Sequence, residues 1–338
     1  MPPRPSKTIS TTRRWLCGAL AFLALGMTAV LPLHAQVPRP LRVAWASIER
    51  ANPASPYLEA FRSGMRELGY TEGKDLVIDP WWGEGTEARL AQQIDAMVRS
   101  QPDVIVAQGG LALHPLMVAQ VKIPIVFGVS ADPIEAKIAE SFARPGGNAT
   151  GMTFFALELV GKRMQIMKEA LPTMKRVALL ADPQHPGQHK ELAAAQAAAD
   201  NLGLQVSYFP VHSEAELESA LADIAHARFD AILAFSDGFT QSFAGRIAEF
   251  SLQQRIPAVD GWSPFARQGN LMIYGPVLEE CYRRLAVYVD KIRKGARPGD
   301  LPIELPTKVE LVINLKTASR IGVTIPQALL LRADELIK

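Results

Sequence analysis

Leu41–Ser47 reads LRVAWAS, and this short apolar run is typical of a buried strand in a parallel sheet. Apolar residues at helical spacing follow over residues 58–68, before a glycine that ends the predicted helix. The runs DVIVA at residues 103–107 and IPIVFG at residues 123–128 predict two further strands. Strands and helices therefore alternate, which indicates an α/β fold with a doubly wound parallel sheet.

The same series of elements returns in the second half of the chain. RVA at residues 42–44 matches RVA at residues 176–178, and DVIVA at residues 103–107 matches DAILA at residues 230–234. Each match is weak alone, but the matching pieces come in one order at nearly constant spacing, as in an internal repeat. The sequence therefore predicts two similar, doubly wound lobes with parallel sheets.

The chain continues after the second lobe is complete. Residues 301–305 and 308–313 predict two more strands, and Asn314 can cap a final helix. Extra segments of this kind suit a chain that crosses several times between its lobes, which makes a hinge. The first lobe is predicted to hold residues 40–151 and about 276–305, and the second lobe residues 152–275 and about 306–338.

Composition excludes several classes of protein. Lys and Arg number 36 and Asp and Glu number 34, and 48% of the 338 residues are hydrophobic, which is ordinary for a globular protein. No polybasic run follows the N-terminal segment, so we expect no nucleic-acid partner. Cys17 and Cys281 form no CxxC or Cys/His pattern, and the sequence predicts no metal site and no cofactor.

Residues 1–35 have the pattern of a secretory signal peptide. Four basic residues precede residues 15–38, which are uncharged and rich in leucine. We expect cleavage near Ala35 and export of the remaining chain. Arg13 and Arg14 leave open a twin-arginine signal, and an uncleaved membrane anchor is the other alternative.

Several stretches resemble motifs of one protein family. Residues 143–151 read ARPGGNATG, residues 61–70 read FRSGMRELGY, and residues 301–332 read LPIELPTKVELVINLKTASRIGVTIPQALLLR. Together they resemble the ABC-transporter substrate-binding proteins of the tryptophan- and aromatic-amino-acid-binding type. The resemblance covers roughly residues 41–336. It implies a periplasmic binding protein type I fold, a periplasmic location and an ABC permease in the inner membrane as partner.

Two positions depart from the pattern of that family. Residues 131–135 read ADPIE where the family often has GDPVG, and Asp182-Pro183 stands where the family often has Asn-Pro. Both positions follow predicted strands and would border the ligand. The resemblance therefore does not carry the identity of the ligand with it.

The first lobe offers polar and small residues where its strands end. Ligands of open α/β sheets bind beyond the carboxyl ends of the strands. Two glycines there would leave backbone N–H groups accessible, and a helix predicted to start at Asp132 and Pro133 would add free amides for a ligand carboxylate. These residues can equally serve only as a turn and a helix cap. The candidates are Ser47, Gln108, Gly109, Gly110, Ser130 and Asp132.

The second lobe offers acids at the corresponding places. Asp237 follows the predicted strand at residues 230–235, and its carboxylate can pair with a ligand ammonium. Alternatively, it only caps a helix predicted over about residues 239–250. Asp182 and Asp260 are further candidates by the same geometry, and Tyr274 adjoins a predicted crossing between lobes.

These features predict an exported, monomeric solute-binding protein of an ABC importer. Its partner would be a small solute, such as an amino acid or a related carboxylate. The pattern of an enzyme is poor, because GVSAD at residues 128–132 lacks the last glycine of GxSxG and Pro186-Gly187 separates His185 from His189. The alternatives are a ligand-sensing subunit of a receptor or regulator, and an exported hydrolase.

Overall fold

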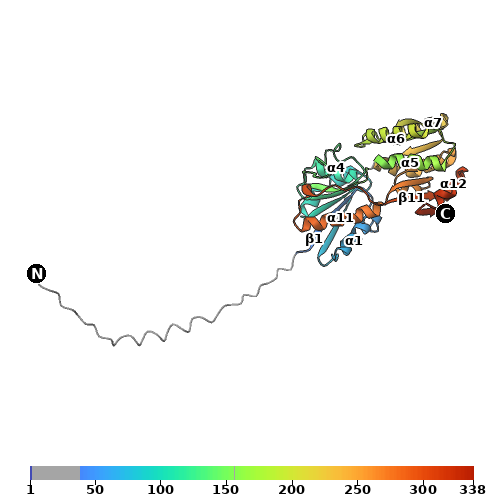
Figure 1. The fold of residues 1–338 in the computed structure, drawn as a ribbon. Coiled ribbons are helices and arrows are strands. Elements are labelled where there is room, and N and C mark those ends of the chain that lie inside the picture. Colours follow the sequence, from blue (N-terminus) through green and yellow to red (C-terminus); the bar gives the residue numbers. More distant parts are fainter. Residues whose placement is uncertain (2–38, 156) are drawn as a thin grey trace. The chain divides into compact units, whose positions relative to one another are not determined.

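The computed structural model describes Met1, residues 39–155 and residues 157–338. The predicted signal peptide and its cleavage near Ala35 therefore lie outside the described residues, apart from Met1. Every helix and strand given below belongs to Pro40–Lys338, which forms one structural unit (Figure 1).

A five-stranded, wholly parallel sheet forms what we call the first lobe, with the helices packed on it. The strand order β2-β1-β3-β4-β5 is one of the common orders of doubly wound sheets. The strands are β1 (Leu41–Ser47), β2 (Leu76–Trp82), β3 (Val104–Gln108), β4 (Ile125–Val129) and β5 (Ala149–Thr153).

Helices cover both faces of this sheet. Val43 and Trp45 of β1 pack with α1 and with the late helix α11, while Ala44 and Ala46 pack into a second core on the other face. Figure 1 shows α1 beside α11, as their many contacts require. The helices are α1 (Pro56–Glu67) and α11 (Leu278–Arg293) on one face, and α2 (Glu87–Ala91), α3 (Ile94–Arg99) and α4 (Gly110–Val118) on the other.

A seven-stranded sheet forms the second lobe, in the order β12-β11-β10-β9-β8-β6-β7. The sequence predicted parallel strands, but β11 runs antiparallel to β10. The reason is local: Val309 pairs with Pro276, so the returning strand begins where β10 ends. The strands are β6 (Arg176–Ala181), β7 (Gln205–Pro210), β8 (Ala231–Ala234), β9 (Ala258–Asp260), β10 (Met272–Pro276), β11 (Val309–Asn314) and β12 (Glu335–Ile337).

Alternate residues of the second sheet also face two separate cores. Val177 and Leu179 of β6 pack toward one set of helices, and Ala178 and Leu180 toward the other. The first set is α5 (Leu157–Ala170), α6 (Gln188–Leu202), α12 (Leu315–Ile321) and α13 (Gln327–Leu330). The second set is α7 (Glu214–His226), α8 (Gly238–Ser242), α9 (Ala244–Gln254) and α10 (Ser263–Arg267).

The chain passes between the lobes after β5, after β10 and before β11. The predicted α/β fold with two doubly wound lobes and several crossings is confirmed. Residues 301–305, predicted as a strand, make only an isolated bridge between Glu304 and Met152. Pro302 lies within this stretch and Pro306 follows it, and neither residue can donate to a ladder of hydrogen bonds.

The helix predicted over residues 239–250 is in fact two helices. α8 ends at Ser242, and α9 begins at Ala244 after a break at Phe243. Across the part of the chain that the structure describes, each helix is too short or too polar to span a membrane.

Candidate functional site

The two lobes touch through the loops that follow β4 and β6. Ser130 Oγ lies 3.0 Å from Nε2 of His185, and Nζ of Lys190 donates to Oδ2 of Asp132 over 2.5 Å. The backbone N–H of Asp132 also donates to the carbonyl oxygen of Pro186, at 3.0 Å. The carboxyl edges of the two sheets therefore face each other. This is the position at which ligands bind in open α/β folds.

A second region of contact brings together the beginnings of two helices. A Cβ atom placed on Gly238, the first residue of α8, would lie 3.6 Å from Cδ1 of Leu111 in the first turn of α4. The rings of Phe154, which follows β5, and of Trp262, which follows β9, also meet edge to face, with centroids 6.4 Å apart. The first turns of α4 and α8 therefore oppose each other across the boundary between the lobes.

Ser47 and Gln108 belong to a network around Glu49 on the first lobe. Gln108 Nε2 donates to Oε1 of Glu49 at 2.7 Å, and Ser47 Oγ accepts from the Glu49 backbone N–H at 3.1 Å. Burial raises the pKa of Glu49 above its usual range, against the opposing effect of its bond with Gln108. Gln108 Oε1 is buried and has no hydrogen-bond partner among the described residues.

Gly109 and Gly110 form the open start of α4. Gly109 has a φ of 84°, which a residue with a side chain adopts only with strain, and its N–H donates to the carbonyl oxygen of Gly128. A Cβ on Gly110 would meet no described atom within 4 Å. The N–H groups of Gly110 and Leu111 begin the helix and have no partner within it. They form an accessible pair of donors at the positive end of α4.

The structure does not form the helix predicted at Asp132 and Pro133. Asp132 Oδ1 accepts from the backbone N–H groups of Ile134 and Glu135, as a helix cap would, but only turns follow. The backbone reverses at Lys137, whose φ is 56°. Burial acts to raise the pKa of Asp132, but its bonds with Lys190 and the two N–H groups prevail and lower that pKa. Asp132 is therefore a partner of the other lobe, with no helix dipole beside it.

Asp237 serves as a helix cap and also keeps one oxygen free. Its Oδ1 accepts from the backbone N–H groups of Phe239 and Thr240, each at 2.8 Å, and so caps α8. Its Oδ2 is buried and has no partner among the residues described. Burial raises the pKa of Asp237 to about 7, and the neighbouring carboxylates Asp182 and Asp260 add to this effect. The cap and the ligand contact predicted as alternatives are thus compatible.

Asp260 lies at the end of β9 in a fully buried position. Its Oδ1 accepts from Ser236 Oγ at 2.8 Å and from the backbone N–H groups of Gly261 and Trp262. Its Oδ2 is buried without a partner in the described part of the chain. Burial raises the pKa of Asp260, while the nearby guanidinium of Arg163 opposes that rise.

The side chains of Asp182 and Tyr274, which were also predicted as ligand contacts, have other contacts in the structure. Asp182 Oδ1 lies 2.9 Å from Nδ1 of His212 and accepts from the backbone N–H of Gln184, so its carboxylate is already engaged. The Tyr274 side chain packs against the hydrophobic core of the second lobe. Only its backbone oxygen reaches the site, where it accepts from Nε of Arg163 at 2.7 Å.

Three residues of the site were not predicted as ligand contacts. Arg163 of α5 is 3% exposed, and burial lowers the pKa of its guanidinium. Glu191, in the first turn of α6, is 8% exposed, and burial raises its pKa to about 8. Burial lowers the pKa of His185 to about 4, so this imidazole is neutral at pH 7. Each lies on a helix or a loop beyond the strand ends that guided the prediction.

The side chains of Ser130, His185 and Glu191 are arranged like the nucleophile, the base and the orienting acid of a catalytic triad. Nδ1 of His185 lies 3.9 Å from the nearer carboxylate oxygen of Glu191, which is too far for a hydrogen bond. A pKa of about 4 also makes His185 a weak base near neutral pH. The arrangement therefore joins the lobes without activating the Ser130 hydroxyl.

The sequence profile of the family described as ABC transporter substrate binding protein matches residues 55–337. The chain belongs to this family. Among its relatives is a "Tyrosine-binding protein" of Clostridioides difficile strain R20291, which is 19% identical over 259 residues and covers 77% of this chain and 74% of the relative.

Solved structures of similar proteins share the fold of this substrate-binding protein. A crystal structure described as the ABC domain from Streptococcus pneumonia in complex with L-Trp is 22% identical, with a TM-score of 0.80, and covers 88% of this chain and 100% of the other. A conserved domain protein from Vibrio cholerae O1 biovar El Tor is 27% identical, with a TM-score of 0.79 and the same coverage. The fold is therefore that of periplasmic binding proteins of type I.

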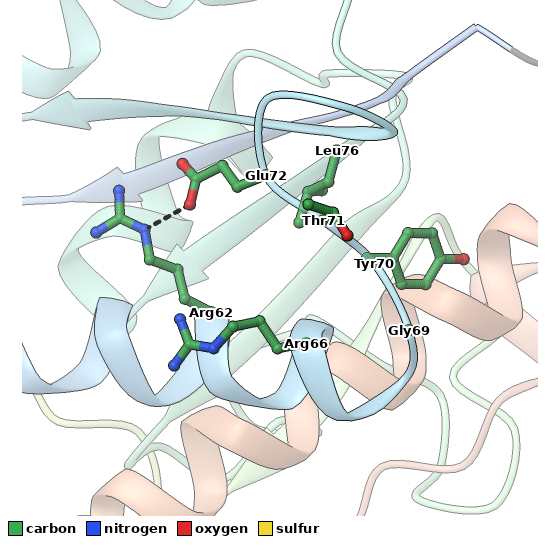
Figure 2. Close-up of a pocket in the computed structure, with 7 residues that line it drawn as sticks. All are labelled: Arg62, Arg66, Gly69, Tyr70, Thr71, Glu72 and Leu76. Atoms are coloured by element: carbon green, nitrogen blue, oxygen red, sulfur yellow. Dashed lines mark hydrogen bonds and ion pairs between the residues drawn. The ribbon is translucent and has the colours of Figure 1, made fainter.

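A separate surface pocket lies on the first lobe of this substrate-binding protein (Figure 2). Leu76, at its wall, is the first residue of β2, so the pocket adjoins the amino edge of the sheet and not the carboxyl edge. Nε of Arg62 donates to Oε2 of Glu72 within it, at 3.1 Å. The pocket is lined by Arg62, Arg66, Gly69, Tyr70, Thr71, Glu72 and Leu76.

The polar groups at the site between the lobes are those of a site for an organic ligand. Nowhere in the described residues do three or more His, Cys, Asp or Glu side chains gather as metal ligands. What the site offers is a pair of N–H donors on α4, two buried carboxylates with free oxygens on the second lobe, and aromatic rings beside them. These groups suit a small ligand that carries one positive and one negative group.

Proposed function

We propose that this substrate-binding protein captures an amino acid with an aromatic or apolar side chain between its two lobes and delivers it to an ABC permease. The observation that carries the proposal is the Oδ2 of Asp237, which is buried and has no hydrogen-bond partner among the described residues. A buried carboxylate oxygen without a partner is costly, and a ligand ammonium would supply both the hydrogen bond and the opposite charge.

The opposite wall suits the carboxylate of the same ligand. The N–H groups of Gly110 and Leu111 lie at the positive end of α4, a helix of nine residues. Leu111 lies close to Gly238, since a Cβ placed on Gly238 would be 3.6 Å from its Cδ1, and Asp237 directly precedes Gly238. An α-amino acid would therefore span the boundary, with its carboxylate on the first lobe and its ammonium on the second.

The side chain of the ligand would lie among aromatic rings. Phe154 and Phe155, which follow β5, are nearly buried, and the Phe154 ring meets the indole of Trp262 edge to face. Aromatic rings bind apolar and aromatic groups because they bury a large apolar surface and can pack edge to face. The binding of L-Trp and of tyrosine by similar proteins, as their names state, supports the same class of ligand here.

The contacts between lobes would form as the ligand is captured. A ligand that touches both lobes stabilises the closed arrangement by contacts that the open one lacks. Ser130–His185 and Asp132–Lys190 are two such contacts. We further propose export of a monomer to the periplasm by the signal at residues 1–35. A loss of labelled amino acid uptake on deletion of the gene would distinguish an importer from a sensor.

Thermal unfolding of residues 36–338 tests the binding function. This segment contains every helix and strand described above. After removal of any carried-over ligand, it is heated with aromatic amino acids, other amino acids, nucleosides and sugars. A ligand at about 100 times its Kd adds about 2.7 kcal/mol of stability. We expect aromatic or apolar amino acids to raise the Tm. Stabilisation by nucleosides or sugars alone would contradict the proposal.

A further inference from the structure

The amide of Gln108 is buried, and only one of its two ends has a partner. Gln108 is the last residue of β3 and is 7% exposed. Its Nε2 donates to Oε1 of Glu49 at 2.7 Å. Its Oε1 is also buried and has no hydrogen-bond partner among the described residues. A buried carbonyl oxygen without a donor is costly, so we expect a group that donates to it.

Glu49 fixes which end of the amide lacks a partner. The backbone N–H of Glu49 donates to Oγ of Ser47, which pairs with Gln108 in the sheet. An ionised carboxylate accepts hydrogen bonds and does not donate them, so it is the amide nitrogen of Gln108 that faces Glu49. The oxygen and the nitrogen of an amide point apart. The Oε1 atom of Gln108 is therefore held away from Glu49, as an acceptor.

The register of the first sheet places Gln108 beside aromatic rings. Side chains alternate along a strand, and Val106 packs on the face of the sheet that carries α1 and α11, so Gln108 points to this face as well. Gln108 is paired with Gly128 of β4. A Cβ placed on Gly128 would lie 3.0 Å from Cζ of Phe154 and 3.0 Å from Cε1 of Tyr282. These two rings therefore occupy the place next to the Gln108 side chain.

The same rings continue to the second lobe and border the proposed site for the ligand. The ring centroid of Phe154 lies 5.7 Å from that of Tyr282 and 6.4 Å from that of Trp262. The N-terminus of α4, which we propose to bind the ligand carboxylate, begins at Gly110, two residues after Gln108. Two residues span at most about 7 Å. One aromatic amino acid can therefore reach both the helix end and the amide of Gln108.

We propose that Gln108 determines the specificity of the site by accepting a hydrogen bond from a donor on the aromatic ring of the ligand, and that Glu49 positions the Gln108 amide for this bond. This inference rests on the proposed function. It names the ligand class as aromatic amino acids that carry an indole N–H or a phenol O–H. Phenylalanine has no such donor, and its binding would leave Oε1 buried and unpaired, which a site of this kind disfavours.

Calorimetry with a matched pair of ligands tests the role of Gln108. L-tryptophan is compared with 3-(3-benzothienyl)-L-alanine, in which a sulfur atom replaces the indole N–H. We expect the unmodified protein to bind L-tryptophan about 10- to 100-fold more tightly. Gln108→Met keeps the length of the side chain without its acceptor and should bind the two ligands almost equally. Gln196→Met is the matched control, because Nε2 of Gln196 also donates to a carboxylate, that of Asp200, but on the exposed surface of α6.

Glu49→Gln tests the positioning of the amide. A neutral amide at residue 49 can donate as well as accept, so Gln108 would no longer be held with its oxygen toward the ring. The preference for L-tryptophan should fall, while the affinity for the benzothienyl analogue should change little. A preference that is unchanged in Glu49→Gln would overturn the role of Glu49.

The ligand pair also separates this inference from the proposed function. Equal affinities of the unmodified protein for the two ligands, or a preference that persists in Gln108→Met, would overturn the role of Gln108 and leave the proposed function standing. The first of these results needs no variant to fold. Binding of no amino acid at all would overturn the proposed function, and this inference with it.

Discussion

Lys190 and Asp132 form an ion pair between the lobes, with Nζ 2.5 Å from Oδ2. The Asp132 side chain is 7% exposed and the Lys190 side chain 39% exposed, so the pair is partly shielded from water. Lys190 also lies 2.8 Å from Oε1 of Glu135. One lysine of α6 therefore binds two acids of the first lobe.

Lys190→Met should weaken ligand binding severalfold, although Lys190 lies outside the proposed ligand contacts. The closed arrangement loses its contact, so the ligand should dissociate faster while its association rate changes little. Stopped-flow fluorescence with L-tryptophan measures both rates. Lys294→Met is the matched control, because Lys294 follows the last residue of α11 and pairs with the buried Asp290 of that same helix. Equal dissociation rates for the two variants would show that the Lys190 pair does not hold the lobes together.

Gly110→Val should reduce affinity with little effect on folding. A Cβ at Gly110 meets no described atom within 4 Å, and this glycine has no positive φ, so the protein should unfold at nearly the same temperature. The new side chain would stand in front of the N–H groups proposed to hold the carboxylate. Gly147→Val is the control, because Gly147 has similar open space in a turn of the first lobe. An unchanged affinity of Gly110→Val for the ligand would show that the N-terminus of α4 does not bind the ligand carboxylate.

Gly261→Ala should destabilise the protein by about 1–3 kcal/mol, as overpacked core residues do. A methyl group on Gly261 would overlap Nη2 of Arg163 and Oγ of Ser236. Ser236 is held by its bond to Asp260, and Arg163 by its bond to the carbonyl oxygen of Tyr274. Gly161→Ala, in the interior of α5, should instead stabilise by about 0.5–1 kcal/mol, because its Cβ would lie 3.8 Å from Cβ of Ala198. Denaturant unfolding measures both changes. An unchanged free energy of unfolding in Gly261→Ala would show that the Arg163 side chain can move away from the added methyl group.

The unliganded protein should lose stability as the pH rises from about 5 to about 8. Burial raises the pKa of Asp237 to about 7 and that of Glu191 to about 8, far above their values in an unfolded chain. In this window the folded protein keeps protons that the unfolded chain gives up, so each rise in pH favours unfolding. Urea unfolding at several pH values measures the trend. A stability that rises steadily from pH 5 to pH 8 would contradict these raised pKa values.

The ends of the strands could be predicted from the sequence, because each strand is a run of apolar residues. Ligands of this fold bind where such strands end, so the residues there were the candidates. Asp237 and Asp260 were predicted in this way. Arg163 and Glu191 were not, because a charged residue on an amphipathic helix normally faces water. Their burial depends on how α5 and α6 pack on each other and beside β10 and β7, and only the structure gives that packing.

The helix predicted at Asp132 is a case in which a local sequence pattern predicted an element that the structure does not form. An aspartate followed by proline suits the start of a helix, and Asp132 does accept from the next free N–H groups. The chain then turns, and the rest of the carboxylate binds Lys190 from the other lobe. A contact between residues 58 positions apart leaves no local trace in the sequence.

Calorimetric titration of L-tryptophan into the unmodified protein and into Asp237→Asn tests the central proposal most directly. Asparagine keeps an oxygen to cap α8 and replaces the charged oxygen that would accept from the ammonium by an uncharged NH2 donor. A charge-assisted hydrogen bond is worth about 1.5–3 kcal/mol, so affinity should fall by about 10- to 100-fold. N-acetyl-L-tryptophan, which lacks the ammonium, should bind both proteins equally weakly. Equal affinity of the two proteins for L-tryptophan would show that Asp237 does not hold the ligand.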